Sequence, residues 1–449
     1  MIHKIGNTIK RMLPSPFSIA IILTITIILT ALILTEKTIG EIIIFWEEGL
    51  WKSKMMAFAM QMMLMLVLGY VIALTNGFKK LTKTIKPLCN NTANAAFLVA
   101  FSTIIVSFFN WGLGLIFGAI LAREVGQHSL EKNLNLNYPL IGAAAYSGLM
   151  VWHGGISGTI PLKIAEKDPF SDMIINEKLL AQLGNNEINF SETVFSQMNI
   201  VISLSLIIII PSVLFIIGKN NKEGNRIIEF KKPKKQIKEK VTGAEKIDHS
   251  MLFSKIIGLI IILIAFKKGL TANSLSFINP NFINFLLLGL AIFLHDNLNS
   301  FLSSVNEAII SASGILIQFP LYFGIMGIMN SSGLVDIFAN FFVSISNSST
   351  YPIFTMFSGG LVNIFVPSGG GQWMVQGPIV LQSSFELGIP IEKSIMALAY
   401  GDQLTNMMQP FWALPLLGIT QLKAKEIFPY TIIIMIVGIC IFSTGLLIF

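Results

Sequence analysis

Four short glycine-rich or polar stretches interrupt apolar segments of this 449-residue chain. They are residues 110–114 (Asn-Trp-Gly-Leu-Gly), 153–159 (His-Gly-Gly-Ile-Ser-Gly-Thr), 367–372 (Pro-Ser-Gly-Gly-Gly-Gln) and 401–406 (Gly-Asp-Gln-Leu-Thr-Asn). Glycine lets the backbone turn and approach a ligand closely, and a helix that resumes after a break presents free N–H groups and the positive end of its dipole. Such stretches are suited to bind a small carboxylate.

His153 and Asp402 are ionisable residues within these stretches, and each could serve in ion coupling. A histidine inside an apolar segment could relay a proton, donate to a substrate carboxylate, or be a neutral residue hydrogen-bonded to a neighbour. Asp402 is expected to act in ion coupling or gating, because an ionisable group inside a membrane bundle is costly to bury; a helix-capping role is the alternative. Carbonyl, hydroxyl and amide oxygens at the same breaks would suit a sodium ion, so proton and sodium both remain open.

The expected ligands fall into two groups. We expect a substrate to be bound by Asn110, Trp111, Gly112, His153, Gly154, Gly155, Ser157, Ser368, Gly369, Gly370, Gln372 and Trp373. We expect the coupled ion to be bound by Asp402, Thr405 and Asn406. The alternative is that the glycines only allow helices to pack closely. Four such stretches at repeat-related positions favour a binding site.

The elements that must position these residues are membrane helices. Hydrophobic residues make up 53% of the chain and charged residues 12%, about half the charged share of a soluble domain. Many apolar runs reach the roughly 20 residues that cross a bilayer, so the sequence predicts an all-α polytopic membrane protein. The two cysteines, Cys89 and Cys440, are too few and too far apart for a disulfide framework or a cysteine metal site.

The distribution of charge predicts an orientation in the membrane rather than binding to nucleic acid. Residues 219–248 contain ten Lys or Arg against five acids, whereas residues 166–192 contain six acids. Basic connections stay in the cytoplasm, so the N-terminus and the linker 218–250 are expected to be cytoplasmic and the acidic loop external. We therefore expect a multi-pass protein of the inner, cytoplasmic membrane.

Two blocks of sequence recur in the second half of the chain. Phe101, Ser102, Val106, Phe109 and Gly114 return 256 positions later as Phe357, Ser358, Val362, Phe365 and Gly370. Residues 143–146 (Ala-Ala-Ala-Tyr) return 254 positions later as residues 397–400 (Ala-Leu-Ala-Tyr). Duplicated halves with helices broken at matching places are typical of secondary transporters.

The duplication divides the chain into two halves joined by the basic linker. The N-terminal half, 1–217, is predicted to contain a re-entrant hairpin at about 93–122 that enters from the cytoplasmic side and a broken helix at about 138–165. The C-terminal half, 251–449, is predicted to contain a re-entrant hairpin at about 351–385 that enters from outside and a broken helix at about 391–420. Hairpins that enter from opposite faces predict two inverted-topology repeats.

Sequence motifs of enzymes do not occur in the chain. It has no HExxH, no GxSxG and no Walker loop, since the glycines at 369–371 are not followed by Gly-Lys-Ser or Gly-Lys-Thr. We therefore expect neither an enzyme nor a cofactor.

Four longer strings give the sequence a family resemblance. They are residues 109–114 (Phe-Asn-Trp-Gly-Leu-Gly), 152–158 (Trp-His-Gly-Gly-Ile-Ser-Gly), 367–373 (Pro-Ser-Gly-Gly-Gly-Gln-Trp) and 400–406 (Tyr-Gly-Asp-Gln-Leu-Thr-Asn). Over essentially its whole length the chain resembles the bacterial short-chain fatty acid transporters, which look like members of a larger ion-transporter superfamily. The resemblance implies inverted repeats, hairpin tips at 110–114 and 367–372, unwound helices at 153–159 and 401–406, and a homodimer. Dicarboxylate carriers of that superfamily have Ser-Asn-Thr tips, and their absence here weighs against sodium coupling and dicarboxylates.

We therefore expect a symporter of butyrate, acetoacetate or a similar monocarboxylate, with its alkyl tail against Trp111, Trp152 or Trp373. Carriers of lactate or of a dicarboxylate are alternatives within transport. A membrane-embedded enzyme or a regulatory membrane subunit is an alternative from a different class. The duplication favours transport, because two inverted halves provide alternating access.

Overall fold

The fold is all-helical, as expected. The computed structural model describes residues 14–75, 85–165, 188–220, 243–271, 277 and 280–449, and it contains no strand within these ranges. Most of the linker 218–250 and most of the acidic loop lie outside the described residues. Helix α11 (Gln197–Asn220) continues past the predicted boundary at 217.

Five described helices are long and apolar enough to cross a membrane, which confirms a multi-pass membrane protein. They are α2 (Pro16–Leu34), α4 (Ser53–Ala73), α6 (Thr92–Phe109), α11 and α22 (Ala424–Ile448). A sixth span is formed if α16 (Ser313–Ser331) and α17 (Leu334–Ser344) count as one, although they meet at 62°. Many apolar side chains on these helices are exposed, as a lipid environment requires.

Two helical hairpins are present, one at each copy of the first duplicated block. In the first, α6 and α7 (Trp111–Glu131) meet at Asn110, whose backbone is extended. In the second, α18 (Tyr351–Phe365) and α19 (Gly369–Glu386) meet at residues 366–368. The first hairpin turns after Phe109 and the second after Phe365, so both turns occur at the same position of the duplicated block. The first hairpin is longer than predicted, because α7 continues nine residues beyond 122 to Glu131.

Each hairpin is followed by an interrupted helix. The first consists of α8 (Tyr138–Tyr146), the 3-10 turn η2 (Ser147–Val151) and α9 (Thr159–Ile164), and we call the irregular residues 152–158 break 1. The second consists of α20 (Ile391–Thr405), the 3-10 turn η5 (Asn406–Met408) and α21 (Pro410–Thr420), and we call residues 406–409 break 2. The prediction of unwinding at 401–406 was wrong for residues 401–405, which are helical.

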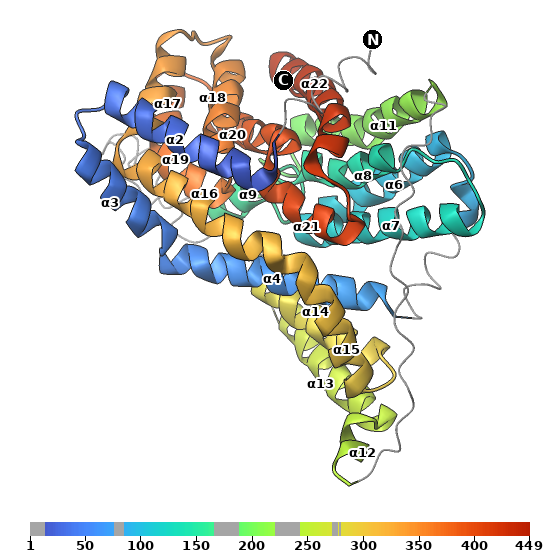
Figure 1. The fold of residues 1–449 in the computed structure, drawn as a ribbon. Helices are drawn as coiled ribbons and strands as arrows, with labels where there is room; N and C mark the ends of the chain where they lie inside the picture. The colour runs from blue at the N-terminus through green and yellow to red at the C-terminus, as the bar shows by residue number, and fades with distance from the viewer. Residues whose placement is uncertain (1–13, 76–84, 166–187, 221–242, 272–276, 278–279) are drawn as a thin grey trace.

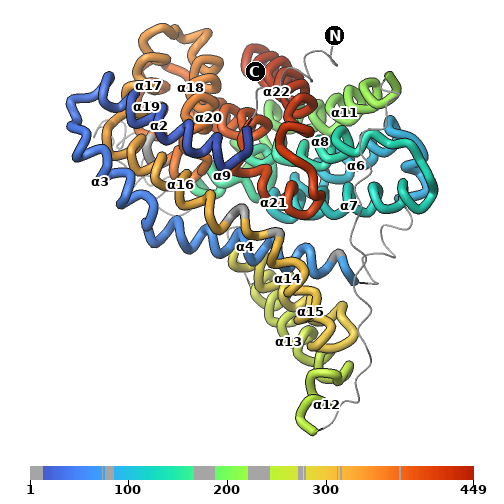
Figure 2. The backbone as a smooth tube through the Cα atoms, viewed as in Figure 1, coloured from blue at the N-terminus to red at the C-terminus, as the bar shows by residue number. Residues whose placement is uncertain are grey.

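The two hairpins lie on opposite sides of the molecule, and the interrupted helices lie between them (Figure 2). Within this body α7 packs on η2 and α21, and α19 packs on α9 and α20. A separate group of helices projects from the body next to α4 (Figure 1). This group comprises α12 (Glu245–Asp248), α13 (Met251–Leu270), α14 (Pro280–Leu294) and α15 (Leu298–Ala308). Helix α3 (Ile39–Leu50) packs along α16.

Glycine explains how α18 and α20 approach one another closely. A Cβ atom at Gly401 would lie 2.0 Å from the carbonyl oxygen of Met356, and one at Gly359 would lie 2.8 Å from that of Leu398. Gly401 therefore serves close helix packing, the alternative considered for the glycine-rich stretches. This packing brings the next residues of α20, Asp402 and Gln403, to a fixed position in the body.

Replacement of Gly401 by alanine is expected to destabilise the protein by about 1–3 kcal/mol, because a backbone carbonyl cannot yield to the new methyl group. Thermal unfolding in detergent measures this effect. Gly40→Ala is the matched control, since Gly40 is helical and exposed and its nearest neighbouring atom is 4.0 Å from the added Cβ. Equal unfolding temperatures for the two variants would contradict this explanation of the helix contact.

Candidate functional site

The two ionisable residues predicted from the sequence meet in the protein interior. His153 in break 1 and Asp402 in α20 lie 249 positions apart, and His153 Nε2 is 3.0 Å from Asp402 Oδ1. The two side chains are 0% and 1% exposed. A carboxylate buried in an apolar bundle is costly unless it is paired or hydrogen-bonded, so this contact is the main compensation for Asp402.

The hydrogen bonds around the imidazole favour one tautomer. The backbone N–H of Ile160 points to His153 Nδ1 at 3.5 Å, which makes Nδ1 an acceptor. In a neutral ring Nε2 then carries the hydrogen and donates it to Asp402. The remaining carboxylate oxygen, Asp402 Oδ2, is buried without a hydrogen-bond partner within the described chain. The imidazole therefore satisfies one carboxylate oxygen of Asp402 and leaves the other available to a further donor.

Gln403 joins α20 to the irregular backbone of break 1. Its Oε1 atom accepts hydrogen bonds from the backbone N–H groups of His153 at 2.7 Å and Gly154 at 3.3 Å. Because these donors fix the orientation of the amide, Nε2 of Gln403 must be the donor on the other side. That atom is buried and has no acceptor in the described structure. Gln403 belongs to the polar stretch 401–406 noted in the sequence, but the sequence gave no reason to select it as a site residue.

The tip of the first hairpin packs on break 1. The backbone N–H of Trp111 donates to Ser157 Oγ at 3.0 Å, and the N–H of Ile156 donates to the Phe108 carbonyl at 2.8 Å. A Cβ at Gly155 would lie 2.5 Å from that carbonyl oxygen, so this glycine permits the close approach. Asn110 instead caps α7, because its Oδ1 accepts from the Leu113 N–H at 2.8 Å.

The tip of the second hairpin contacts His153 of break 1. A Cβ at Gly369 would lie 2.5 Å from His153 Cε1, so the glycine backbone covers the imidazole directly. A Cβ at Gly370 would be in ordinary contact, 3.4 Å from the Thr159 methyl group. Ser368 caps α19 by accepting from the Gly371 N–H. Tips from both hairpins and a residue of α20 thus converge on break 1.

Break 2 is held by a residue that was not predicted. Asn363, near the end of α18, donates through Nδ2 towards the Asp402 carbonyl at 2.7 Å, Thr405 Oγ1 at 3.0 Å and Asn406 Oδ1 at 2.8 Å. Thr405 in turn donates to the Gly360 carbonyl at 3.0 Å. Thr405 and Asn406 therefore join α20 to the second hairpin. Asn363 lies six residues after the duplicated Phe357 and gave no sequence signal.

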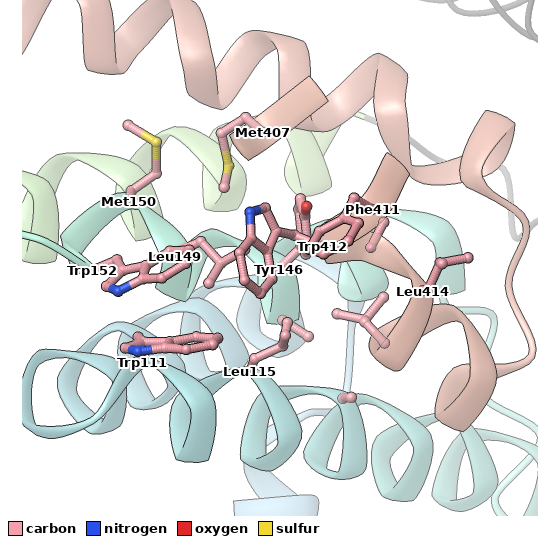
Figure 3. Close-up of a cluster of buried hydrophobic side chains, with 14 of the residues drawn as sticks. Trp111, Leu115, Tyr146, Leu149, Met150, Trp152, Met407, Phe411, Trp412 and Leu414 are labelled. Carbon is pink, nitrogen blue, oxygen red and sulfur yellow. The ribbon is translucent and has the colours of Figure 1, made fainter. Parts of the chain in front are cut away.

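Trp111, Trp152 and Trp412 form a buried aromatic cluster, which we call the aromatic wall (Figure 3). The Trp111 and Trp152 rings stack with their centroids 4.1 Å apart, and Figure 3 shows their indole nitrogens at the same end of the stack. Trp152 also stacks on His153 at 5.1 Å. Trp412 of α21 lies edge-on to both tryptophans, at 5.2 Å and 4.6 Å. Trp412 was not predicted, and its partners lie about 260 or 300 residues away in the sequence.

Four predicted ligands make other contacts. Trp373 packs with Ile160 and Ile164 in a separate cluster, so it does not line the wall formed by the other tryptophans. Gln372 donates within the second hairpin, to the Gly359 carbonyl and to Gln376. Gly112 packs against α4, where an added Cβ would lie 2.6 Å from the sulfur atom of Met65. Gly154 allows Asn199 to approach, because an added Cβ would lie 2.8 Å from its Oδ1 atom.

Buried hydrogen-bond donors without an acceptor occur in this region. Within the described residues they include Trp152 Nε1, Trp412 Nε1, Gln403 Nε2 and Asn406 Nδ2. A buried donor left unpaired costs about 1–3 kcal/mol, so each of these atoms favours an acceptor in the site. A carboxylate supplies several acceptor positions at once. The arrangement therefore combines an apolar aromatic wall with donors suited to a small organic anion.

Metal binding has little support from charged ligands. No group of three or more His, Cys, Asp or Glu side chains could hold a metal ion in the described parts of the chain. Two buried carboxamide oxygens near break 2, Asn363 Oδ1 and Gln409 Oε1, lack a donor there and are of the type that could ligate sodium. Sodium would therefore depend on neutral oxygens.

Comparison with solved structures finds transporters of similar extent. One is the Alcanivorax borkumensis YdaH transporter, with a TM-score of 0.45, 12% sequence identity, and coverage of 96% of this chain and 98% of that chain. Another is Neisseria gonorrhoeae MtrF, with a TM-score of 0.39, 15% identity, and coverage of 98% and 97%.

Sequence relatives are closer. A protein of Escherichia coli (strain K12) named "Putative short-chain fatty acid transporter" is 33% identical over 446 residues, which cover 98% of this chain and 97% of the relative. A protein of the same name from Haemophilus influenzae is 34% identical over 452 residues, with the same coverage. The profile of the family described as "Short chain fatty acid transporter" matches residues 1–449. The chain therefore belongs to the short-chain fatty acid transporter family, and it is a transporter rather than an enzyme.

Proposed function

We propose that this protein is a proton-coupled symporter that carries short-chain fatty acids such as butyrate or acetoacetate across the cytoplasmic membrane. The observation that supports this function best is the junction at break 1. There, unsatisfied buried donors lie beside an aromatic wall and beside the His153–Asp402 pair. This combination suits one carboxylate, one short alkyl chain and one proton.

The carboxylate would be bound by Gln403 Nε2 and Trp152 Nε1. Both atoms are buried donors, and both residues adjoin His153: Trp152 stacks on its ring and Gln403 accepts from its backbone N–H. The alkyl chain would lie against Trp111, Trp152 and Trp412. Donors fixed in place by backbone contacts are effective because they need little reorganisation when the anion arrives.

The coupled proton would be shared by His153 and Asp402. In the neutral histidine form the pair carries one negative charge, and a protonated pair carries none. Entry of a carboxylate beside an existing negative charge is unfavourable in a dry site. Binding of the anion would therefore favour protonation of the pair. This charge balance supports a proton more directly than the neutral oxygens near break 2 support sodium.

Alternating access would come from the two hairpins. The hairpin tips at Trp111 and Gly369 contact different residues of break 1, Ser157 and His153. If the hairpins enter from opposite faces of the membrane, as the loop charges predict, withdrawal of either tip would open the site to one face only. The site residues described above include no lysine or arginine that would bind the second charge of a dicarboxylate.

Substitution of Gln403 tests the position of the carboxylate. Gln403→Glu keeps an oxygen for the His153 and Gly154 N–H groups but replaces the free donor with a second acceptor, so KM for butyrate should rise at least about tenfold. Initial rates of labelled butyrate uptake into proteoliposomes, after subtraction of uptake by protein-free liposomes, give KM. Gln61→Glu, on the α4–α14 contact, is the control. An unchanged KM for Gln403→Glu would remove this residue from the binding site.

Substrate length tests the aromatic wall. Each methylene buried against the tryptophans should contribute about 0.8 kcal/mol, so affinity should rise about fourfold from acetate to propionate and again to butyrate. Competition with labelled butyrate uptake measures these affinities. Stronger competition by succinate than by butyrate would contradict the monocarboxylate assignment and favour a dicarboxylate carrier.

Separate ion gradients test the coupling. An inward proton gradient at equal sodium should drive butyrate accumulation above that of protein-free liposomes, which take up the neutral acid by diffusion. A sodium gradient at equal pH should have no effect. Asp402→Asn should lose the proton-driven component but keep exchange of butyrate for butyrate, because the donors for the carboxylate remain. Accumulation driven by sodium alone would contradict proton coupling.

A further inference from the structure

Two tyrosines at the same position of the duplicated block are fully buried. Tyr146 ends α8 and Tyr400 lies within α20, 254 positions later, and each is 0% exposed. A buried tyrosine hydroxyl normally needs a hydrogen-bond partner. The partners of these two hydroxyls place each tyrosine in contact with the other half of the chain.

Tyr146 holds the backbone of break 2. Its hydroxyl is 2.7 Å from the Asn406 carbonyl and 3.1 Å from the Gln409 carbonyl. In a continuous α-helix the Asn406 carbonyl would accept from the residue four positions later, but that residue is Pro410, which has no N–H. The Asn406 carbonyl also accepts from the Gln409 N–H at 3.1 Å. Tyr146 therefore adds a second donor at a carbonyl whose usual helical donor is removed by proline.

Tyr400 acts on break 1 through one intermediate side chain. Its hydroxyl donates to Asn199 Oδ1 at 3.0 Å, and Asn199 Nδ2 donates to the Gly154 carbonyl at 2.8 Å. Asn199 Nδ2 also donates to the Val194 carbonyl at 2.7 Å. The two hydrogen bonds donated by Nδ2 thus fix the orientation of the Asn199 amide, so that Oδ1 faces the Tyr400 hydroxyl. Gly154 directly follows His153, so this chain of bonds ends beside the proposed site.

We propose that Tyr146 and Tyr400 are reciprocal positioning residues, each of which fixes the irregular backbone of the opposite half through its hydroxyl group. Tyr146 positions Asn406 and the start of α21, and hence Trp412. Tyr400 positions Gly154, and hence His153 and the two backbone N–H groups that donate to Gln403. The pair would keep the donors for the carboxylate and the aromatic wall in one geometry. The consequence for substrate affinity rests on the proposed function, whereas the effect on the backbone does not.

Hydrogen–deuterium exchange of the full-length protein in detergent tests the backbone effect without any substrate. Tyr146→Phe should increase exchange about fivefold at residues 406–409, in the half that does not contain the substitution. Tyr400→Phe should do the same at residues 152–158. Tyr351→Phe is the matched control: Tyr351 is also buried and donates to a carbonyl, Val380, but within its own hairpin at 3.0 Å.

We expect each tyrosine variant to increase exchange only at the break in the opposite half of the chain, which we call the crossed pattern. The control variant should change exchange at neither break. Faster exchange confined to the half that carries the substitution, or an equal effect from all three variants, would overturn the proposal. Butyrate uptake by proteoliposomes provides the second measurement. Tyr146→Phe and Tyr400→Phe should raise KM about threefold to tenfold, with Vmax and unfolding temperature close to those of Tyr351→Phe.

The two measurements separate the two proposals. If wild-type protein takes up no butyrate while the crossed exchange pattern appears, the proposed function fails and the positioning role stands. If uptake is normal and KM is unchanged in both tyrosine variants, the positioning role in transport is overturned and the proposed function stands.

Discussion

The need to satisfy interrupted backbone inside an apolar bundle governs the whole structure. Lipid offers no hydrogen bonds, so each helix break must find donors and acceptors within the protein. Break 1 obtains them from Gln403, Asn199 and the Phe108 carbonyl, and break 2 obtains one from Tyr146. Gln403 and Tyr146 each belong to the other half of the chain from the break that they support. The breaks thus tie the two halves together at the place where a substrate would bind.

That constraint also explains why amide side chains at the two breaks have unsatisfied donors. Gln403 uses its oxygen for break 1, and its nitrogen is consequently left for another acceptor. In the same way, Asn406 Oδ1 accepts a hydrogen bond from Asn363, and Asn406 Nδ2 is left without an acceptor in the described structure. Amide side chains that support irregular backbone on one side present donors on the other. The proposed binding chemistry for an anion follows from the architecture of the breaks.

The sequence predicted the fold class, both hairpin tips and break 1, because glycine, proline and polar residues interrupt the apolar segments at these places. It misplaced break 2, since Gly401 is a packing residue, and Asp402 and Gln403 contact break 1 from an intact helix. Pro410, which cannot donate, was the better signal. Trp373 and Trp412 could not be sorted, because the partners of both are distant in sequence. Pairing of His153 with Asp402 likewise depends on tertiary structure.

Photolabelling with a butyrate analogue that carries a diazirine on its alkyl chain tests most directly whether the two breaks share one small-anion site. The purified protein would be irradiated with the analogue, with and without excess butyrate, and the labelled residues mapped by mass spectrometry. Labels at Trp111, Trp152 or Trp412 that butyrate suppresses are the predicted result. Labels that butyrate suppresses only outside residues 108–115, 150–160 and 400–413 would contradict a shared site at the junction of the two halves.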